Sequence, residues 1–318
     1  MKRIRLGIDG GGTSTRCIVV DADMNILSRG EGGPANYRKV GLERVFASLR
    51  EAVLSAVQAI EQPEIAAVGF GLAGVDKAGD KARILGLIER LKADLPENVV
   101  WNCNSHSILI TNDAEIALAG GIEENIGIVV VAGTGTIVYG RNAQNETWKV
   151  DGWGHLLGDD GSAFDIGKRA LRKVTRGCDR RYKPTKLMQL ALQHFGISNL
   201  GELKEVIYGS ESPAEKIASF AVSVDLAASQ GNEVARKIIN KAALQLAVST
   251  LVLKDVLFIG HTKVKVITSG GVWKSIAGLR EMFIYRLNEN TKNLVVCEPM
   301  NEPAWGAAKL TVNYLNNK

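Results

Sequence analysis

Two turns of the sequence are rich in glycine and threonine, and each follows a short apolar run. The first occupies residues 10–15, directly after Asp9, and the second occupies residues 133–136. Such turns expose backbone N–H groups with no side chain in the way, and concave sets of N–H groups bind phosphate oxygens. A single turn could be only a tight hairpin, in which glycine is routine. The repeated pair with a flanking aspartate favours phosphate binding, with the two turns holding a triphosphate from both sides.

Two aspartates could act next to these phosphates. Asp9 adjoins the first turn, where a carboxylate would coordinate Mg²⁺ directly or through water. Asp113 stands between an expected strand end and a helical run beginning at Ile116. A carboxylate there can cap the helix, or it can serve as a general base that takes a proton from a hydroxyl. Position alone does not decide between these roles.

Two further loops carry polar groups suited to a sugar. Residues 152–162 are glycine-rich and include Trp153, His155, Asp159 and Asp160. Aspartates beside an aromatic ring suit recognition of vicinal hydroxyls, whereas one histidine and two adjacent aspartates are a poor metal ligand set. Residues 32–37 form a similar loop in which Asn36 offers both a donor and an acceptor. Helix capping by either aspartate, and a plain turn role for Asn36, are the alternatives.

Two common phosphate motifs are absent. The dinucleotide fingerprint requires a strand, a G-x-G-x-x-G turn and then a helix, but residues 10–12 lead into another expected strand. A Walker A loop requires four residues between its glycines, whereas five separate Gly161 from Gly167. The sequence therefore excludes both of these nucleotide-binding loops.

Composition and charge predict an ordinary globular protein rather than a nucleic-acid-binding or membrane protein. The 318 residues carry a formal net charge of +5, with 46% hydrophobic and 23% charged residues. Basic residues are densest over residues 168–183, which we interpret as a solvated helix face. The longest apolar helical run, residues 242–253, is too short to cross a membrane. Four widely spaced cysteines indicate reduced thiols, so we expect a cytoplasmic protein.

Hydrophobic periodicity predicts an α/β chain with an internal repeat. Residues 4–8, 16–21 and 26–29 are expected strands, and residues 42–61 have the spacing of a helix. Residues 128–154 repeat the plan of residues 6–33: strand, Gly-Thr turn, strand, turn, strand and glycine-rich loop. Residues 160–255 are mostly helical, and residues 304–315 form a last helix. The repeat predicts two similar domains facing each other.

Taken together, these motifs resemble those of the actin-like ATPase superfamily. The resemblance is narrower to the N-acetylglucosamine kinases and broad-specificity archaeal hexokinases of the BadF/BadG/BcrA/BcrD ATPase group. It rests on the two turns and on five further stretches: residues 33–37, 69–74, 112–114, 152–162 and 269–271. The closing segment, residues 303–308, also matches. The resemblance implies two ribonuclease-H-like domains that close over ATP and a sugar, one formed by residues 1–114 with 303–318 and the other by residues 115–302.

The resemblance also implies residue roles. Asp113 would be the catalytic base, and Asp9 would organise Mg²⁺. The nucleotide would be held by Gly11, Gly12, Thr13, Thr15, Gly133, Thr134, Gly135, Gly270 and Gly271. The sugar would be held by Asn36, Gly74, Asp113, Thr134, Trp153 and Asp159.

The implied activity is ATP-dependent phosphorylation of the 6-hydroxyl of N-acetylglucosamine, glucosamine or a related hexose such as glucose. One alternative is an ATP-driven activator of a radical dehydratase, which would need a cysteine-bound iron–sulfur cluster; no cysteine lies between residues 104 and 177. Another alternative is a nucleotide switch without chemistry. Homodimers are the commonest oligomers, so a homodimer with a small-molecule substrate is expected.

Overall fold

The computed structural model describes residues 1–260 and 263–316 and divides into two compact units. The first unit comprises Met1–Ile126 and Glu298–Lys318, and the second comprises Gly127–Cys297. The sequence placed these boundaries at residues 114 and 303, and residues 317 and 318 of that assignment lie outside the described residues. The first unit retains helix α3 (Asp113–Gly121) because Ile116 and Ala119 pack against Ala307 and Leu310 of the C-terminal helix.

A six-stranded mixed sheet forms the first unit. Its strands run in the order β3-β2-β1-β4-β5, with β6 also paired to β4. The strands are β1 (Lys2–Gly10), β2 (Thr15–Val20), β3 (Ile26–Gly32), β4 (Pro63–Leu72), β5 (Val100–Trp101) and β6 (Ile108–Thr111). The first three strands are antiparallel, and β1, β4 and β6 are parallel.

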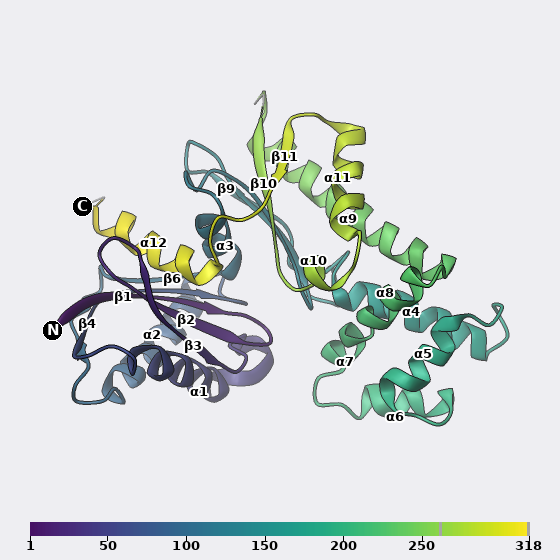
Figure 1. Ribbon diagram of the computed structural model, residues 1–318, viewed down its shortest axis with the longest axis horizontal. Coiled ribbons are helices and arrows are strands. Elements are labelled where there is room, and N and C mark those ends of the chain that lie inside the picture. The colour runs from purple at the N-terminus through teal and green to yellow at the C-terminus, as the bar shows by residue number, and fades with distance from the viewer. Residues whose placement is uncertain (261–262, 317–318) are drawn as a thin grey trace. The chain divides into compact units, whose positions relative to one another are not determined.

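Helices cover both faces of this sheet, as Figure 1 shows. On one face lie α1 (Tyr37–Val57) and α2 (Ala78–Ala93), whose apolar sides join the core of β1 and β4. On the other face lie α3 and α12 (Pro303–Asn316). Helix α12 comes so near the sheet that a Cβ on Gly7 would lie 1.9 Å from the carbonyl oxygen of Ala304. Glycine is therefore required at position 7, where α12 crosses β1.

The second unit repeats this sheet plan. Its strand order is β11-β10-β7-β8-β9, with β7, β8 and β9 antiparallel and β10 parallel to both β7 and β11. The strands are β7 (Gly127–Ala132), β8 (Thr136–Arg141), β9 (Thr147–Asp151), β10 (Val264–Ser269) and β11 (Leu294–Cys297). The order β9-β8-β7-β10 matches β3-β2-β1-β4, so the predicted internal repeat is confirmed.

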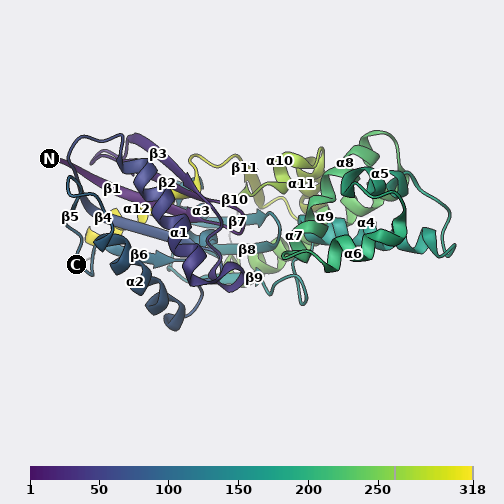
Figure 2. The same ribbon diagram turned by 90° about the horizontal axis from the view of Figure 1, so that it is seen from below.

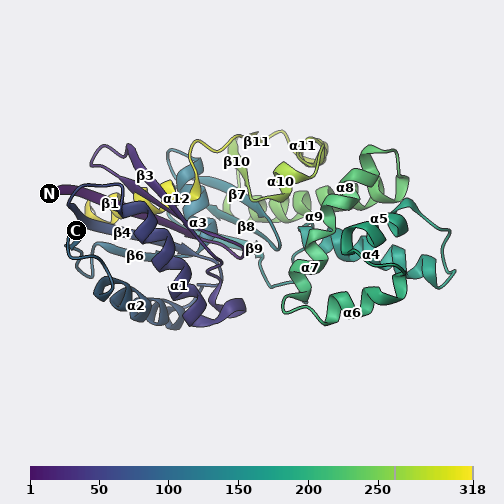
Figure 3. The same ribbon diagram turned by 60° about the horizontal axis from the view of Figure 1, so that its bottom comes forward.

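The second unit carries a group of helices besides its longest helix, α9 (Glu233–Leu257) (Figures 2 and 3). They are α4 (Ala163–Cys178), α5 (Lys186–Phe195), α6 (Leu203–Tyr208), α7 (Pro213–Ser219) and α8 (Ala221–Ser229). The 3₁₀ turn η1 (Leu200–Glu202) precedes α6, and α10 (Val272–Ser275) and α11 (Leu279–Asn290) follow β10. One apolar core joins α4, α5, α8, α9 and α11 to the strands. Across the described residues, no helix combines the length and apolarity that a membrane crossing requires.

The first long helix begins earlier than its periodicity predicts. It starts at Tyr37 rather than at residue 42, because the side chain of Asn36 caps it by accepting from the Arg38 N–H. Gly41 then departs from helical geometry with φ +76°. Glycine tolerates this conformation, so the first turn is held at an angle to the rest of the helix.

Candidate functional site

The strand register of the first unit brings its two candidate aspartates to one edge of the sheet. Asp9 pairs with Gly71 in the neighbouring parallel strand, and Gly71 pairs with Thr111 in the next. Asp113 follows Thr111 by two residues and is the first residue of α3. Because the carboxyl ends of these parallel strands meet at the same edge, residues more than a hundred positions apart become neighbours.

The surroundings of Asp9 oppose its negative charge. Burial and the nearby carboxylates of Asp113 and Glu302 raise its pKa to about 7, although the cation of Arg16 acts in the opposite direction. Among residues 1–260 and 263–316, the Asp9 carboxylate has no hydrogen-bond or ion-pair partner, and no three metal-ligating side chains gather. A half-buried carboxylate among like charges fits a divalent cation that keeps most of its ligands as water.

Asp113 does not have the capping role that its position allowed. Asn112, not Asp113, is the helix cap, since its side chain accepts from the Glu115 N–H at 2.8 Å. The Asp113 carboxylate accepts from the neighbouring Ala114 N–H at 3.0 Å. Burial raises the pKa of Asp113, and the charge of Asp76 adds to this against the opposing local backbone N–H groups. A carboxylate with a raised pKa is better able to receive a proton than an ordinary aspartate.

The first glycine-rich turn lies beside these carboxylates. It is closed by a bond from the Gly11 N–H to the Ser14 carbonyl at 2.9 Å, and its base is tied down by bonds from Ala35 to Gly11 and from Ala73 to Gly10. Thr13 is exposed. Thr15 is fully buried, and its hydroxyl donates to the Gly33 carbonyl at 2.7 Å. This places Thr15 in the support of the turn rather than on its surface.

Asn36 and Gly74, both predicted to bind sugar, are brought together. A Cβ on Gly74 would lie 2.8 Å from the Asn36 side-chain oxygen, and Gly74 has φ +85°. Arg38 bridges this pair to Asp80, because its guanidinium donates to the Gly74 carbonyl at 2.8 Å and to Asp80 at 2.9 Å. The buried Asp80 also accepts from the Tyr37 hydroxyl and from the backbone N–H groups that follow Val75. This network holds Asn36 and Gly74 in place relative to each other.

Replacing Asp80 by alanine is expected to lower the free energy of unfolding by about 2 kcal/mol at neutral pH, because several charge-assisted hydrogen bonds lose their acceptor. The Tyr37 hydroxyl, the two backbone N–H groups and Arg38 hold the pKa of Asp80 well below its usual range. Its contribution is therefore complete above the unfolded pKa near 3.9 and is lost as the pH falls below it. Urea unfolding measured across acidic pH checks this: the wild type should lose stability with acid more steeply than the variant.

The second glycine-rich turn is anchored to the start of α4. The Ala163 N–H donates to the Gly133 carbonyl at 2.9 Å, and the Gly133 N–H donates to Gly135 at 2.9 Å. Among the described residues, nothing lies within 4 Å of where a Cβ on Gly133 would stand, so a ligand can approach the backbone there. The turn therefore combines a fixed backbone with an open face.

Asp159 is fixed behind this second turn. It is 8% exposed, and one carboxylate oxygen accepts from the Thr136 N–H at 2.9 Å. A Cβ on Gly135 would lie 2.8 Å from the same carboxylate. The Asp159 N–H in turn donates to Asp151 at 2.7 Å. Asp159 thus connects the loop of residues 152–162 to the second glycine-rich turn, a link that residue order does not reveal.

Gly270 joins the same part of the second unit. It has φ +102°, and a Cβ there would lie 2.3 Å from the Ala132 carbonyl oxygen, so only glycine fits. Gly271 opens toward free space. The segment predicted to contact adenosine therefore lies directly beside the strand that enters the second glycine-rich turn. Trp153 is 74% exposed, and its Cβ lies 3.4 Å from where a Cβ on Gly158, the residue before Asp159, would stand.

Two acidic residues near the site were missed from sequence. Asp76 and Glu302 both raise the pKa of a predicted functional aspartate. Glu302 comes from the segment that precedes α12, where it also accepts from Arg29 at 3.0 Å. The only sequence signal was the acidic residue immediately before Pro303, which starts the last helix. Lys39 was missed as well: its Nζ would lie 3.7 Å from a Cβ on Gly12.

A family model matches residues 6–311, which is nearly the whole chain. The chain belongs to the BadF/BadG/BcrA/BcrD ATPase family. A family member similar to it is the N-acetylmuramic acid/N-acetylglucosamine kinase of Clostridium acetobutylicum, 34% identical over 95% of this chain and 96% of that protein. The N-acetyl-D-glucosamine kinase of Dictyostelium discoideum is 28% identical over 98% of each chain.

Solved structures support the fold of this family member. A protein from Chromobacterium violaceum, assigned as an N-acetylglucosamine kinase, has a TM-score of 0.73 at 20% identity, covering 98% of this chain and 99% of that chain. A ROK family glucokinase from Streptomyces griseus has a TM-score of 0.56 at 18% identity, covering 98% of this chain and 99% of that chain. The predicted actin-like ATPase fold is confirmed.

Proposed function

We propose that this chain is an ATP-dependent sugar kinase that transfers the γ-phosphoryl group to the 6-hydroxyl of N-acetylglucosamine or a related amino sugar or hexose. The observation that carries the proposal is the pair of carboxylates, Asp9 and Asp113, held together at the end of three parallel strands. The kinase relatives that span nearly the whole chain favour this function over a dehydratase activator or a switch without chemistry.

The mechanism assigns each unit its own task. In the first unit, Asp113 takes the proton from the sugar 6-hydroxyl as the hydroxyl oxygen attacks the γ-phosphorus and ADP leaves. The N–H groups of residues 12 and 13 hold phosphate oxygens, and Gly11 shapes the turn through its bond to Ser14. In the second unit, Gly133, Thr134 and Gly135 hold phosphate from a fixed turn. Bound Mg²⁺, held through Asp9, would neutralise the phosphate charge. Phosphoryl transfer depends chiefly on such positioning and charge neutralisation.

The remaining assignments follow the same division. Asn36 and Gly74 bind the sugar in the first unit, and Trp153, Asp159 and Thr134 bind it in the second. Gly270 and Gly271 lie against the adenosine. We further propose a cytoplasmic homodimer that needs neither nucleic acid nor membrane for activity.

ADP release in the presence of Mg-ATP tests the proposed function. The panel comprises N-acetylglucosamine, glucosamine, glucose, mannose, N-acetylmannosamine, N-acetylmuramic acid and a control without sugar. A sharp rise with one or a few amino sugars is expected, with the phosphate located on the 6-oxygen by NMR. A flat panel with slow basal hydrolysis would overturn the kinase assignment, and EDTA should abolish turnover.

Two substitutions of Asp159 separate its contacts. Asparagine can still accept from the Thr136 N–H but lacks the charge that holds sugar hydroxyls, so Asp159→Asn should raise the sugar KM about tenfold with little change in the ATP KM. Alanine also releases the turn, so Asp159→Ala should raise both KM values. Steady-state kinetics with each substrate varied in turn provides the measurement. If both variants raised the KM for sugar and the KM for ATP by the same factor, Asp159 would only support the turn and would not bind the sugar.

A further inference from the structure

The densest basic stretch of the sequence forms one wall of a groove in the second unit. On α4, four cations recur at the spacing of one helical face: Arg169, Arg172, Lys173 and Arg176. Val234, Lys237, Ile238 and Lys241 recur at the same spacing on the facing side of α9. Between them lies a groove of about 510 Å³, a volume within the range of small-ligand pockets. The solvated helix face expected from sequence is therefore concave and lined with cations.

Most of the groove's positive charge is not neutralised by the protein. Arg169 pairs with Asp165 at 2.7 Å, and Lys237 lies 3.9 Å from Glu233. By contrast, the other four cations have no carboxylate partner within residues 1–260 and 263–316: Arg172, Lys173, Arg176 and Lys241. Four like charges converging on one groove repel one another, and an anion between them would relieve that repulsion.

Tyr182 closes one side of the groove with an aromatic surface. The Lys173 ammonium lies 4.2 Å from the ring centre, and the Arg176 guanidinium lies 5.8 Å from it. These two cations lower the pKa of the Tyr182 hydroxyl. Val234 and the buried Ile238 supply the apolar floor. The groove thus offers charge around its rim and an apolar body below.

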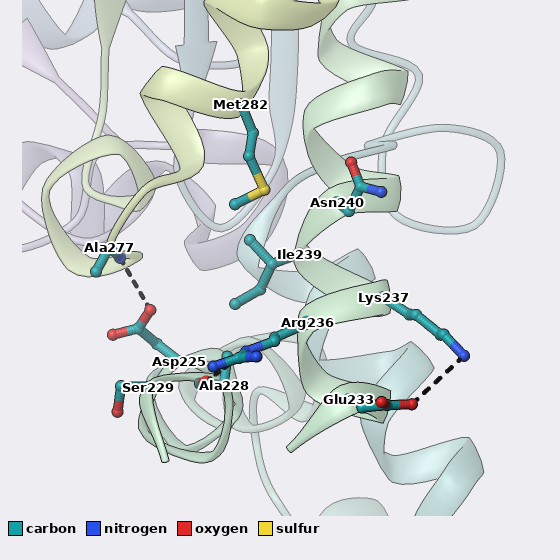
Figure 4. Close-up of a pocket in the computed structure, with 10 residues that line it drawn as sticks. All are labelled: Asp225, Ala228, Ser229, Glu233, Arg236, Lys237, Ile239, Asn240, Ala277 and Met282. Carbon is teal, nitrogen blue, oxygen red and sulfur yellow. Dashed lines mark hydrogen bonds and ion pairs between the residues drawn. The ribbon is translucent and has the colours of Figure 1, made fainter. Parts of the chain in front are cut away.

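A second cavity of the same unit provides a comparison, because its charged side chains are paired within the protein. It measures about 800 Å³ and lies between α8, α9 and the start of α11 (Figure 4). Its charged side chains have partners within the cavity wall: Asp225 accepts from the Ala277 N–H, and Glu233 pairs with Lys237. Arg236 donates to the Ala228 carbonyl. The charges of this cavity are compensated, whereas those of the groove are not.

We propose that the groove between α4 and α9 binds a small metabolite carrying two phosphoryl groups. Each phosphate bears about 1.5 to 2 negative charges at neutral pH, so two phosphates match the four uncompensated cations. Arginine contributes paired donors that suit phosphate oxygens, and the ring of Tyr182 accommodates the body of the ligand. This site is built from different residues than the phosphate turns, so it is additional to the proposed ATP site.

Inorganic pyrophosphate is the probe, titrated calorimetrically into the full chain without Mg²⁺. The groove variant carries Arg172→Gln with Lys241→Gln, both at exposed positions outside the proposed catalytic machinery. The matched control carries Lys183→Gln with Lys186→Gln, which removes the same charge from exposed lysines that do not line the groove. Pyrophosphate held at the ATP turns contributes equally to all three proteins. We expect the groove variant to lose affinity about tenfold or more while the control stays within about twofold.

Three results would overturn the proposal. One is absence of pyrophosphate binding by the wild type, and another is an equal loss in the groove and control variants, which would indicate only a general charge effect. The third is retained pyrophosphate binding by the groove variant with selective loss of binding to a single-stranded DNA oligonucleotide or to phosphatidylserine vesicles. Kinase turnover at saturating substrates should be unchanged in both variants, which verifies that they are folded.

Discussion

Replacing Asp113 by asparagine is expected to reduce kcat by about a hundredfold or more, with the KM values for sugar and ATP changed less than about threefold. Asparagine has nearly the same shape as aspartate, so the start of α3 and its cap at Asn112 should persist. The amide cannot take the proton of the attacking hydroxyl. The loss therefore falls on the chemical step, which steady-state kinetics and a single-turnover measurement separate from binding.

The neighbouring carboxylate of Asp76 provides the control for this variant. It raises the pKa of Asp113 by its charge but is not assigned as the base. Asp76→Asn should therefore lose less than about tenfold in kcat. If Asp76→Asn lost as much turnover as Asp113→Asn, or if Asp113→Asn turned over at the wild-type rate, the base would have to be reassigned.

Gly306→Ala should have the second large effect, lowering the free energy of unfolding by about 2–3 kcal/mol. Gly306 lies where α12 crosses α3, and a Cβ there would come within 2.0 Å of the Ile116 carbonyl oxygen and 2.4 Å of the Gly120 nitrogen. Both neighbours are helix backbone, so the two helices would have to separate. Because α3 begins at Asp113, the separation should also reduce turnover.

Gly86→Ala is the matched control for that substitution. Gly86 is an exposed residue within α2, and no described atom lies within 4 Å of where its Cβ would stand. The same change there should be neutral or stabilise by up to about 1 kcal/mol, because alanine restricts the unfolded chain. Urea unfolding and hydrogen exchange of residues 113–121 provide the measurements. Comparable stability of the two variants would show that the helices adapt to the added methyl.

The parts of the fold that sequence could predict are those controlled by short patterns. Alternating apolar strands around the two Gly-Thr turns revealed the repeat, and strand order then follows from it. The nearness of Asp9 and Asp113 could be expected only through a family resemblance, because strand register, not spacing, brings them together. Their surroundings depend on Glu302, about 190 residues beyond Asp113.

Side-chain roles were harder to predict where one residue type serves two purposes. Thr15 belongs to a glycine- and threonine-rich turn of the kind that binds phosphate, but its hydroxyl donates to the Gly33 carbonyl instead. The basic stretch after residue 168 looked like solvated surface because helix α9, which completes the groove, follows only after four intervening helices. In both cases the deciding partner is distant in sequence, and hydrophobic periodicity carries no information about it.

The packing of α12 has a consequence for how the chain is made. Residues 298–316 leave the ribosome only after the entire second unit, yet they cover β1 and β4, where a Cβ on Gly7 or Gly69 would overlap helix backbone. During synthesis, at about 5–20 residues per second, the part of this face that α12 covers therefore stays exposed for the time needed to translate some 170 residues. The early strands are exposed to chaperones or to other nascent chains throughout that interval, and ribosome stalling before residue 303 would prolong it.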